Sequence, residues 1–103
     1  MSVKELSAAE FADAVKTGTV LVDFWATWCG PCKMMLSVFD QVAAEVGDSV
    51  KMYKFNIEES SEIAAEHGVS MVPTFILFKD GEKKASLTGP QSKVKLLDFA
   101  KKA

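Results

Sequence analysis

Apolar residues along the chain follow two different spacings, and the changes between them predict the order of helices and strands. Apolar positions three and four residues apart predict amphipathic helices over 8–17, 31–46, 61–67 and 92–102. Short runs rich in β-branched and aromatic residues predict strands over 20–25, 50–57, 74–78 and 84–88. The run 20–25 is apolar at almost every position, which is typical of a central strand covered on both faces.

Residues that prefer helix ends and turns support these boundaries. Ser7 and Glu10 form a capping-box pattern at the start of the first helix. Gly47 and Gly68 follow the second and third helices, where glycine commonly ends a helix. Asp80–Gly81 lies between two predicted strands and predicts a hairpin turn.

The helical spacing also predicts which side chains face the core, and the element order predicts the fold class. In the second helix these side chains are Met34, Met35, Val38, Phe39, Val42 and Val46, and in the last helix they are Val94, Leu97 and Phe99. Alternating helices and strands imply parallel strands with right-handed crossovers, and the hairpin adds antiparallel strands. The predicted class is α/β, with a mixed, twisted central sheet and helices on both faces.

Length and composition indicate a small soluble domain. The 103 residues, of which 49% are hydrophobic and 25% charged, suit one domain over 1–103. A net charge of −2 argues against nucleic acid as a partner, because surfaces that bind nucleic acid are basic. No apolar run reaches membrane-spanning length, and residues 1–10 lack the apolar stretch of a signal peptide. We therefore expect a cytoplasmic protein with no membrane partner.

The chain has two cysteines, Cys29 and Cys32, separated by two residues after the central strand. A structural zinc or iron–sulfur site takes four cysteine or histidine ligands. This chain has two cysteines and one histidine, His67, which are too few for such a site. A site shared between two chains is the remaining metal alternative, and we expect no metal. A disulfide that closes so short a loop stabilises a fold little, so the pair indicates a redox-active dithiol.

The position of the pair at the start of a helix predicts different roles for the two thiols. The positive helix end favours a thiolate on Cys29, which we expect to be the exposed nucleophile. We expect Cys32, one turn further along, to be the shielded thiol that resolves the mixed disulfide. Gly30 and Pro31 carry no side chain that donates a hydrogen bond to the thiolate, which favours a reductant. The expected redox group is a reversible Cys29–Cys32 disulfide, without a bound cofactor.

Asp23 is a carboxylate inside an otherwise apolar strand. A position at a strand end or sheet edge would leave it in water, but the apolar residues on both sides favour burial. Burial disfavours the charged form and raises the pKa of a carboxyl group. Each pKa unit corresponds to about 1.4 kcal/mol, so an ionised Asp23 would destabilise the fold, which points to a functional reason for keeping it.

Longer segments around these residues resemble a known family. The run from Val22 to Lys33 is similar to the active-site signature of the thioredoxin family, as are Met71–Phe75 and Phe78–Gly81. The resemblance extends from about residue 6 to residue 100. It implies the thioredoxin fold and a general dithiol–disulfide oxidoreductase that acts as a disulfide reductase. It also implies disulfide-containing proteins as substrates and a thioredoxin reductase as electron donor; we expect a monomer.

The resemblance further implies roles for single residues. It makes Asp23 the base and acid for Cys32, and places Lys54 close to Asp23. It implies a cis Val72–Pro73 bond that faces the dithiol, where the backbone of Val72 pairs with an extended substrate segment. The implied docking surface comprises Trp28, Gly30, Pro31, Met71, Val72, Pro73 and Gly89.

Ser37 departs from the family pattern, which usually has a proline five residues after the second cysteine. A serine keeps its backbone N–H, so we expect the helix to be straighter than in relatives. Two other functions remain as alternatives. One is a dedicated disulfide oxidant or isomerase, and the other is a non-redox binding subunit that uses the fold as a rigid docking module.

Overall fold

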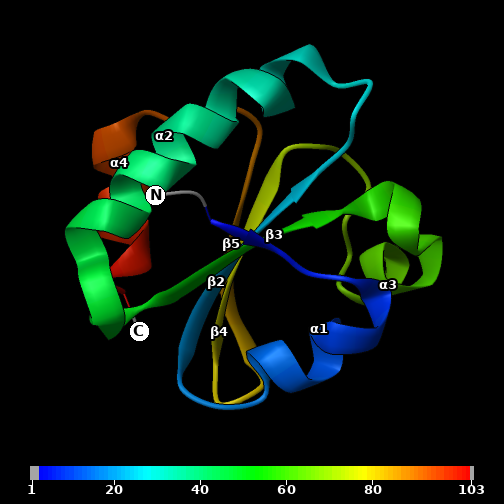
Figure 1. Cartoon of the computed structure of the whole chain (residues 1–103), viewed down its shortest axis with the longest axis horizontal. Helices are drawn as coiled ribbons and strands as arrows, with labels where there is room; N and C mark the ends of the chain where they lie inside the picture. Colours follow the sequence, from blue (N-terminus) through cyan, green and yellow to red (C-terminus); the bar gives the residue numbers. More distant parts are fainter. Residues whose placement is uncertain (1–2, 103) are drawn as a thin grey trace.

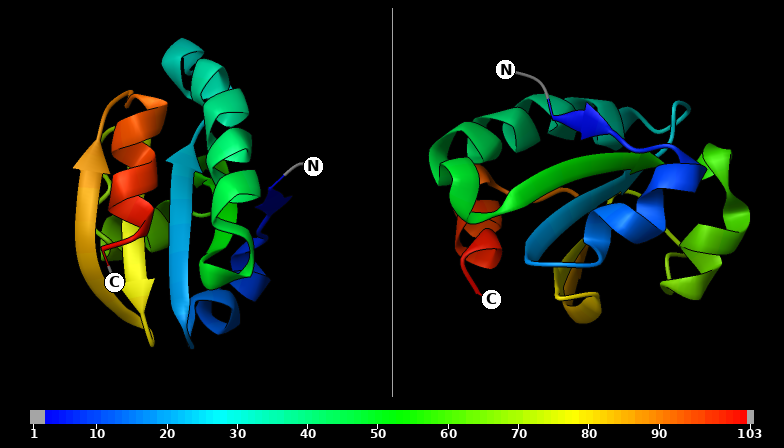
Figure 2. Two further views of the ribbon diagram at one scale, coloured as in Figure 1. Left: turned by 90° about the vertical axis from the view of Figure 1, so that its left-hand side faces the viewer. Right: turned by 60° about the horizontal axis from the view of Figure 1, so that its bottom comes forward.

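The computed structural model describes residues 3–102, which form a mixed five-stranded sheet between two pairs of helices (Figures 1 and 2). In chain order the elements are β1 (Lys4–Glu5), α1 (Ala8–Val15), β2 (Thr19–Trp25), α2 (Gly30–Val46), β3 (Lys51–Asn56), α3 (Ser61–Glu66), β4 (Thr74–Lys79), β5 (Glu82–Thr88) and α4 (Lys93–Ala100). Short 3₁₀ turns follow α2 and β3.

The strand order in the sheet is β1-β3-β2-β4-β5. β1, β3 and β2 run parallel, whereas β4 and β5 run antiparallel to their neighbours. Helices α2 and α4 cover one face of the sheet, and α1 and α3 cover the other (Figures 1 and 2). The predicted α/β class and the mixed sheet with helices on both faces are confirmed.

Alternation along β2 divides the core between the two faces. Leu21 points toward α2 and α4 and joins Phe39, Phe75 and Leu96 in one apolar cluster. Its neighbours along the strand, Val20, Val22 and Phe24, join a second cluster with α1 and α3. Because both faces of β2 are covered, the strand reads as a nearly continuous apolar run in the sequence.

Two of the side chains predicted to face the core lie in solvent. Met34 is 77% exposed and Val94 is 70% exposed. Each residue turns a helix by about 100°, so Met35 faces inward while its neighbour Met34 does not. In α4 the inward residue is Leu96 rather than Val94, because the helix contacts the core with Leu96, Phe99 and Ala100.

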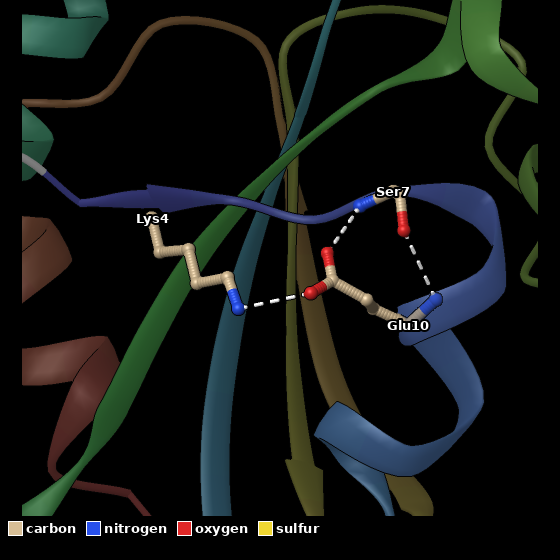
Figure 3. Close-up of polar contacts among 3 residues, drawn as sticks. All are labelled: Lys4, Ser7 and Glu10. Atoms are coloured by element: carbon tan, nitrogen blue, oxygen red, sulfur yellow. Dashed lines mark hydrogen bonds and ion pairs between the residues drawn. The ribbon is translucent and has the colours of Figure 1, made fainter.

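β1 is the strand that the sequence did not predict, and its neighbouring loop is held by side chains. Ser7 caps α1 by accepting a hydrogen bond from the Glu10 N–H, and Glu10 accepts one from the Ser7 N–H (Figure 3). The other carboxylate oxygen of Glu10 pairs with the Lys4 ammonium at 3.0 Å. The Glu10 carboxylate thus connects β1 to the first turn of α1. The capping box was predicted from the sequence, whereas the ion pair with Lys4 was not.

The β4–β5 connection is the two-residue hairpin that Asp80–Gly81 predicted. Both residues have positive φ, 49° and 86°, as a tight hairpin turn of type I′ requires. The Asp80 carboxylate also accepts a hydrogen bond from the Gly18 N–H at 2.8 Å. This hairpin fixes the register of β4, whose first residue, Thr74, directly follows Pro73.

Candidate active site

Cys29 and Cys32 form a disulfide where β2 leads into α2, with 5.2 Å between their Cα atoms. Cys29 is the N-cap of α2, and its sulfur accepts a hydrogen bond from the Cys32 N–H at 3.1 Å. Pro31 occupies the first turn of the helix, where its missing N–H removes no helical hydrogen bond. The sulfur of Cys29 therefore lies at the positive end of a 17-residue helix.

Cys29 and Cys32 differ less in solvent exposure than the sequence predicted. Cys32 is completely buried, as expected, but Cys29 is only 5% exposed. The expectation of an exposed Cys29 is therefore wrong for the disulfide form. Cys29 forms a small buried cluster with Ala26 and Cys32, and Trp25, Ile57 and Val72 pack against this cluster.

The segment around Pro73 faces the disulfide, and the Val72–Pro73 bond is cis. The sulfur of Cys29 lies 3.7 Å from the carbonyl oxygen of Val72. The Gly89 N–H donates to the Pro73 carbonyl at 2.8 Å, and the Thr74 hydroxyl donates to the Met71 carbonyl at 2.7 Å. These bonds fix the backbone opposite Cys29 from two sides.

Apolar and small residues surround this buried sulfur at the surface. Trp28 is 69% exposed and Met71 is 62% exposed, although large apolar side chains are usually covered. Gly30 and Pro31 are also exposed, and Gly89 and Val72 are partly buried. The structure thus brings Cys29 and its chain neighbours together with residues from two distant segments, 71–73 and 89, both of which the sequence named.

Asp23 lies in the middle of β2 and is completely buried. Neither carboxylate oxygen has a hydrogen-bond partner among residues 3–102. The pKa of Asp23 is raised to about 8, mainly by burial and also by the charge of Glu5, while the charge of Lys54 opposes the rise. Lys54 is the register partner of Asp23 on β3, which agrees with the expectation that the two residues lie close together.

Glu5 is a part of this region that the sequence reasoning missed. Its carboxylate accepts hydrogen bonds from the Trp25 indole N–H at 3.2 Å and from the Asn56 N–H at 2.9 Å. Glu5 is the register partner of Lys54 on the edge strand. A charged two-residue strand has no apolar alternation, so no signal in the sequence placed Glu5 beside the site.

Glu58 is a second residue whose position the sequence did not reveal. Its carboxylate accepts hydrogen bonds from both the backbone N–H and the hydroxyl of Thr27, each at 2.7 Å. These two bonds hold the pKa of Glu58 below its usual value. They also fix the loop that presents Trp28 and Cys29 at the start of α2.

Metal ligands and membrane-spanning helices were both sought among the described residues. In residues 3–102 no group of three or more histidine, cysteine, aspartate or glutamate side chains is arranged to hold a metal ion. None of the helices described is long and apolar enough to cross a bilayer.

Comparison with known proteins places this geometry in a family. The sequence model of the Thioredoxin family matches residues 2–102. The chain is 48% identical to a thioredoxin of Rickettsia typhi over 84 residues, which are 82% of this chain and 80% of the relative. It is 38% identical to a thioredoxin of Staphylococcus aureus over 102 residues, which are 99% of this chain and 98% of the relative.

Solved structures agree with the sequences. The oxidised form of mitochondrial thioredoxin 3 from Saccharomyces cerevisiae superposes with a TM-score of 0.87 at 33% identity, covering 98% of this chain and 95% of that one. A thioredoxin of Malassezia sympodialis superposes with a TM-score of 0.85 at 41% identity, covering 96% and 88%. The chain therefore belongs to the thioredoxin family, and it is a thiol–disulfide oxidoreductase that acts as a disulfide reductase.

Proposed function

We propose that Cys29 attacks the target disulfide and that Cys32 resolves the mixed disulfide. The Cys29 thiolate bonds to one target sulfur and releases the other as a thiolate. The Cys32 thiolate then bonds to the sulfur of Cys29 and releases the second target thiol. Two electrons pass from the dithiol to the target, and the enzyme is left as the Cys29–Cys32 disulfide.

The observation that carries this assignment is the position of the Cys29 sulfur at the N-cap of α2. There it accepts the Cys32 N–H, and a charge-assisted hydrogen bond of this kind favours a thiolate. Cys32 lies inside the helix and is completely buried. An incoming protein can therefore approach Cys29 but not Cys32.

Asp23 is the proposed proton carrier for Cys32, and Lys54 modulates its charge. Asp23 belongs to the sheet face that α2 covers, since it alternates with Val22 and Phe24 of the opposite face. A carboxyl group with a pKa of about 8 exchanges its proton near neutral pH, as efficient acid–base catalysis requires. A carboxylate that is completely buried without a hydrogen-bond partner destabilises a fold. A role in catalysis explains why the chain keeps a carboxylate at this position.

Target proteins are proposed to dock on the surface around Cys29. An extended segment of the target pairs with the backbone of Val72, next to Pro73. The surrounding apolar side chains suit loose recognition of many sequences. This docking surface comprises Trp28, Gly30, Pro31, Met71, Val72, Pro73 and Gly89.

The electron donor is proposed to be a thioredoxin reductase, and the 1–103 chain is proposed to act as one domain and as a monomer. We propose the cytoplasm as its compartment. A reducing compartment favours a disulfide that forms and is reduced again over one that persists.

The test is reduction of insulin disulfides with a thioredoxin reductase and its electron donor. The Cys32→Ser variant should accumulate a mixed disulfide with insulin, because the resolving thiol is missing. The matched Cys29→Ser variant should form none. Inactivity of the wild-type protein with an intact dithiol would overturn the proposal, and so would trapping by Cys29→Ser alone.

A further inference from the structure

A row of three charged residues crosses the sheet beside the active site. Glu5 on β1 is in register with Lys54 on β3, and Lys54 is in register with Asp23 on β2. Register partners on parallel strands point to the same face of a sheet. The edge strand therefore places a second carboxylate in the row of the buried Asp23.

Glu5 also contacts the side chain that packs against the disulfide. Both of its carboxylate oxygens lie within hydrogen-bond distance of the Trp25 indole N–H, at 3.2 and 3.3 Å. Trp25 in turn packs against the cluster of Ala26, Cys29 and Cys32. A chain of direct contacts thus connects the edge strand to the redox pair through one indole.

The charges that act on Asp23 come from two strands. β3 contributes Lys54, whose ammonium lies 5.9 Å from the centre of the Trp25 ring. β1 contributes Glu5, and β4 places the apolar Phe75 in register with Asp23. The Cys29–Cys32 disulfide at the start of α2 carries no charge. Lys54 forms no ion pair within 4.0 Å among the described residues, so one cation lies near two carboxylates without being bound to either.

The charges of Glu5 and Lys54 shift the pKa of Asp23 in opposite directions. The charge of Glu5 raises the pKa of Asp23, whereas the charge of Lys54 lowers it. Burial raises the pKa of Glu5 itself, and hydrogen bonds from Trp25 and Asn56 oppose this rise, as does the charge of Lys54; Glu59 adds to it. An ionised Glu5 therefore favours the protonated form of Asp23.

The position of Glu5 is fixed by its chain neighbours. Lys4 pairs with Glu10, and the Ser7–Glu10 capping box holds the segment that follows β1 (Figure 3). The Leu6 N–H donates to the Lys54 carbonyl at 2.9 Å, and Leu6 is buried. Glu5 is thus held at its place in the sheet from both sides.

We propose that Glu5 is a positioning residue for disulfide reduction: it holds the Trp25 indole against the redox pair and competes with Asp23 for the charge of Lys54. It thereby sets the pH at which Asp23 exchanges its proton with Cys32. This inference rests on the proposed role of Asp23. Glu5 acts through Trp25 and Asp23 and does not itself touch a reacting sulfur.

The test is an NMR titration of the Asp23 carboxyl carbon in the disulfide form, from about pH 4 to about pH 10. The Glu5→Gln variant keeps the side-chain size and an oxygen acceptor for Trp25 but removes the charge. It should lower the pKa of Asp23 by about half a pKa unit or more. Glu66→Gln is the matched control, because it removes the same charge from α3 on the opposite face; it should leave the Asp23 titration unchanged. Equal titrations in wild type and Glu5→Gln would overturn the proposal, as would an equal shift in Glu66→Gln.

A kinetic measurement separates this inference from the role of Asp23. In Glu5→Gln the pH midpoint for resolution of the mixed disulfide should move down with the pKa of Asp23. In the Asp23→Asn background the Glu5→Gln change should have no such effect, as a double-mutant cycle of coupled groups predicts. If Asp23→Asn resolves the mixed disulfide as fast as wild type, the proposed role of Asp23 is wrong, and the effect of Glu5 on the Asp23 titration is judged separately. If Asp23→Asn resolves it slowly but Glu5→Gln leaves the pH midpoint of resolution unchanged, only the proposed role of Glu5 is wrong.

Discussion

The sulfur of Cys29 lies 3.7 Å from the carbonyl oxygen of Val72, although the two residues are 43 positions apart in the chain. Cys29 is only 5% exposed, within a cluster against which Trp25, Ile57 and Val72 pack. We therefore expect a target disulfide to reach the sulfur along the rim that the proposed docking surface forms. This rim, more than the sulfur itself, should decide which disulfides approach.

Trp28 is the largest exposed side chain of that rim, at 69% exposure. We expect Trp28→Ala to lower kcat/KM for a protein disulfide about tenfold, which corresponds to about 1.4 kcal/mol of lost contact. The variant should react with a small-molecule disulfide at the wild-type rate, because such a substrate needs no docking surface. Parallel assays with insulin and with a small aromatic disulfide make the comparison. Equal losses with both substrates would assign Trp28 to the chemistry of the dithiol instead.

Removing the charge of Asp23 should stabilise the protein at neutral and alkaline pH. The pKa of Asp23 rises from 3.8 to about 8 on folding, so between these values the folded state retains a proton that the unfolded state has lost. Wild-type stability therefore falls as pH rises through this window and levels off above it. Asp23→Asn has no such loss, and its advantage should grow from near zero at about pH 4 to several kcal/mol at about pH 9. Urea unfolding at several pH values measures the difference; a constant difference across the range would contradict the buried charge.

The same substitution should slow the second half of the reaction. Without a proton acceptor near Cys32, resolution of the mixed disulfide at about pH 7 should fall at least tenfold, within the range that acid–base groups contribute. The first step, attack by Cys29, should change little. Stopped-flow Trp fluorescence with a preformed mixed disulfide follows resolution separately. A loss confined to the first step would place Asp23 in the activation of Cys29.

Ser37 allows a test of the uninterrupted helix. α2 runs from Gly30 to Val46 without a break at Ser37. Ser37→Pro removes a helical hydrogen bond and places its ring against the preceding turn, so we expect the free energy of unfolding to fall by about 3 kcal/mol or more. Ser37→Ala is the matched control: it keeps the N–H and gives up only a long contact with Gln41 at 3.5 Å, so its stability should equal or slightly exceed that of wild type. An equally stable Ser37→Pro would show that this helix accepts the bend of its relatives.

The sequence predicted four of the five strands, β2 to β5, because each of these four carries a local signal. β2 and β4 are apolar over most of their length, and the Asp80–Gly81 turn fixes the pairing of β4 with β5. The cysteine pair also gave a clear signal, since its ligand count was too low for a metal site within one chain and its place before a helix indicated redox chemistry. Elements with a local sequence pattern of this kind can be predicted without knowledge of contacts between distant segments.

The remaining features depend on contacts between distant segments. The burial of Cys29 includes a contact with the distant Val72, and the charge row requires β1 to pair with β3. Neither contact produces a periodic pattern of apolar residues in the sequence. For β1 the reason is that the strand consists of two charged residues. The exposure of Val94 likewise depends on which face of α4 meets the sheet, which a short amphipathic helix leaves open.

The two-residue strand β1 lies at the edge of the sheet and close to the beginning of the chain. An affinity tag or fusion partner joined before it would lie next to the segment that carries Glu5. Kinetic constants for this protein should therefore be measured after tag removal or with a C-terminal tag. A display scaffold built on this fold should likewise present its cargo from the C-terminal end.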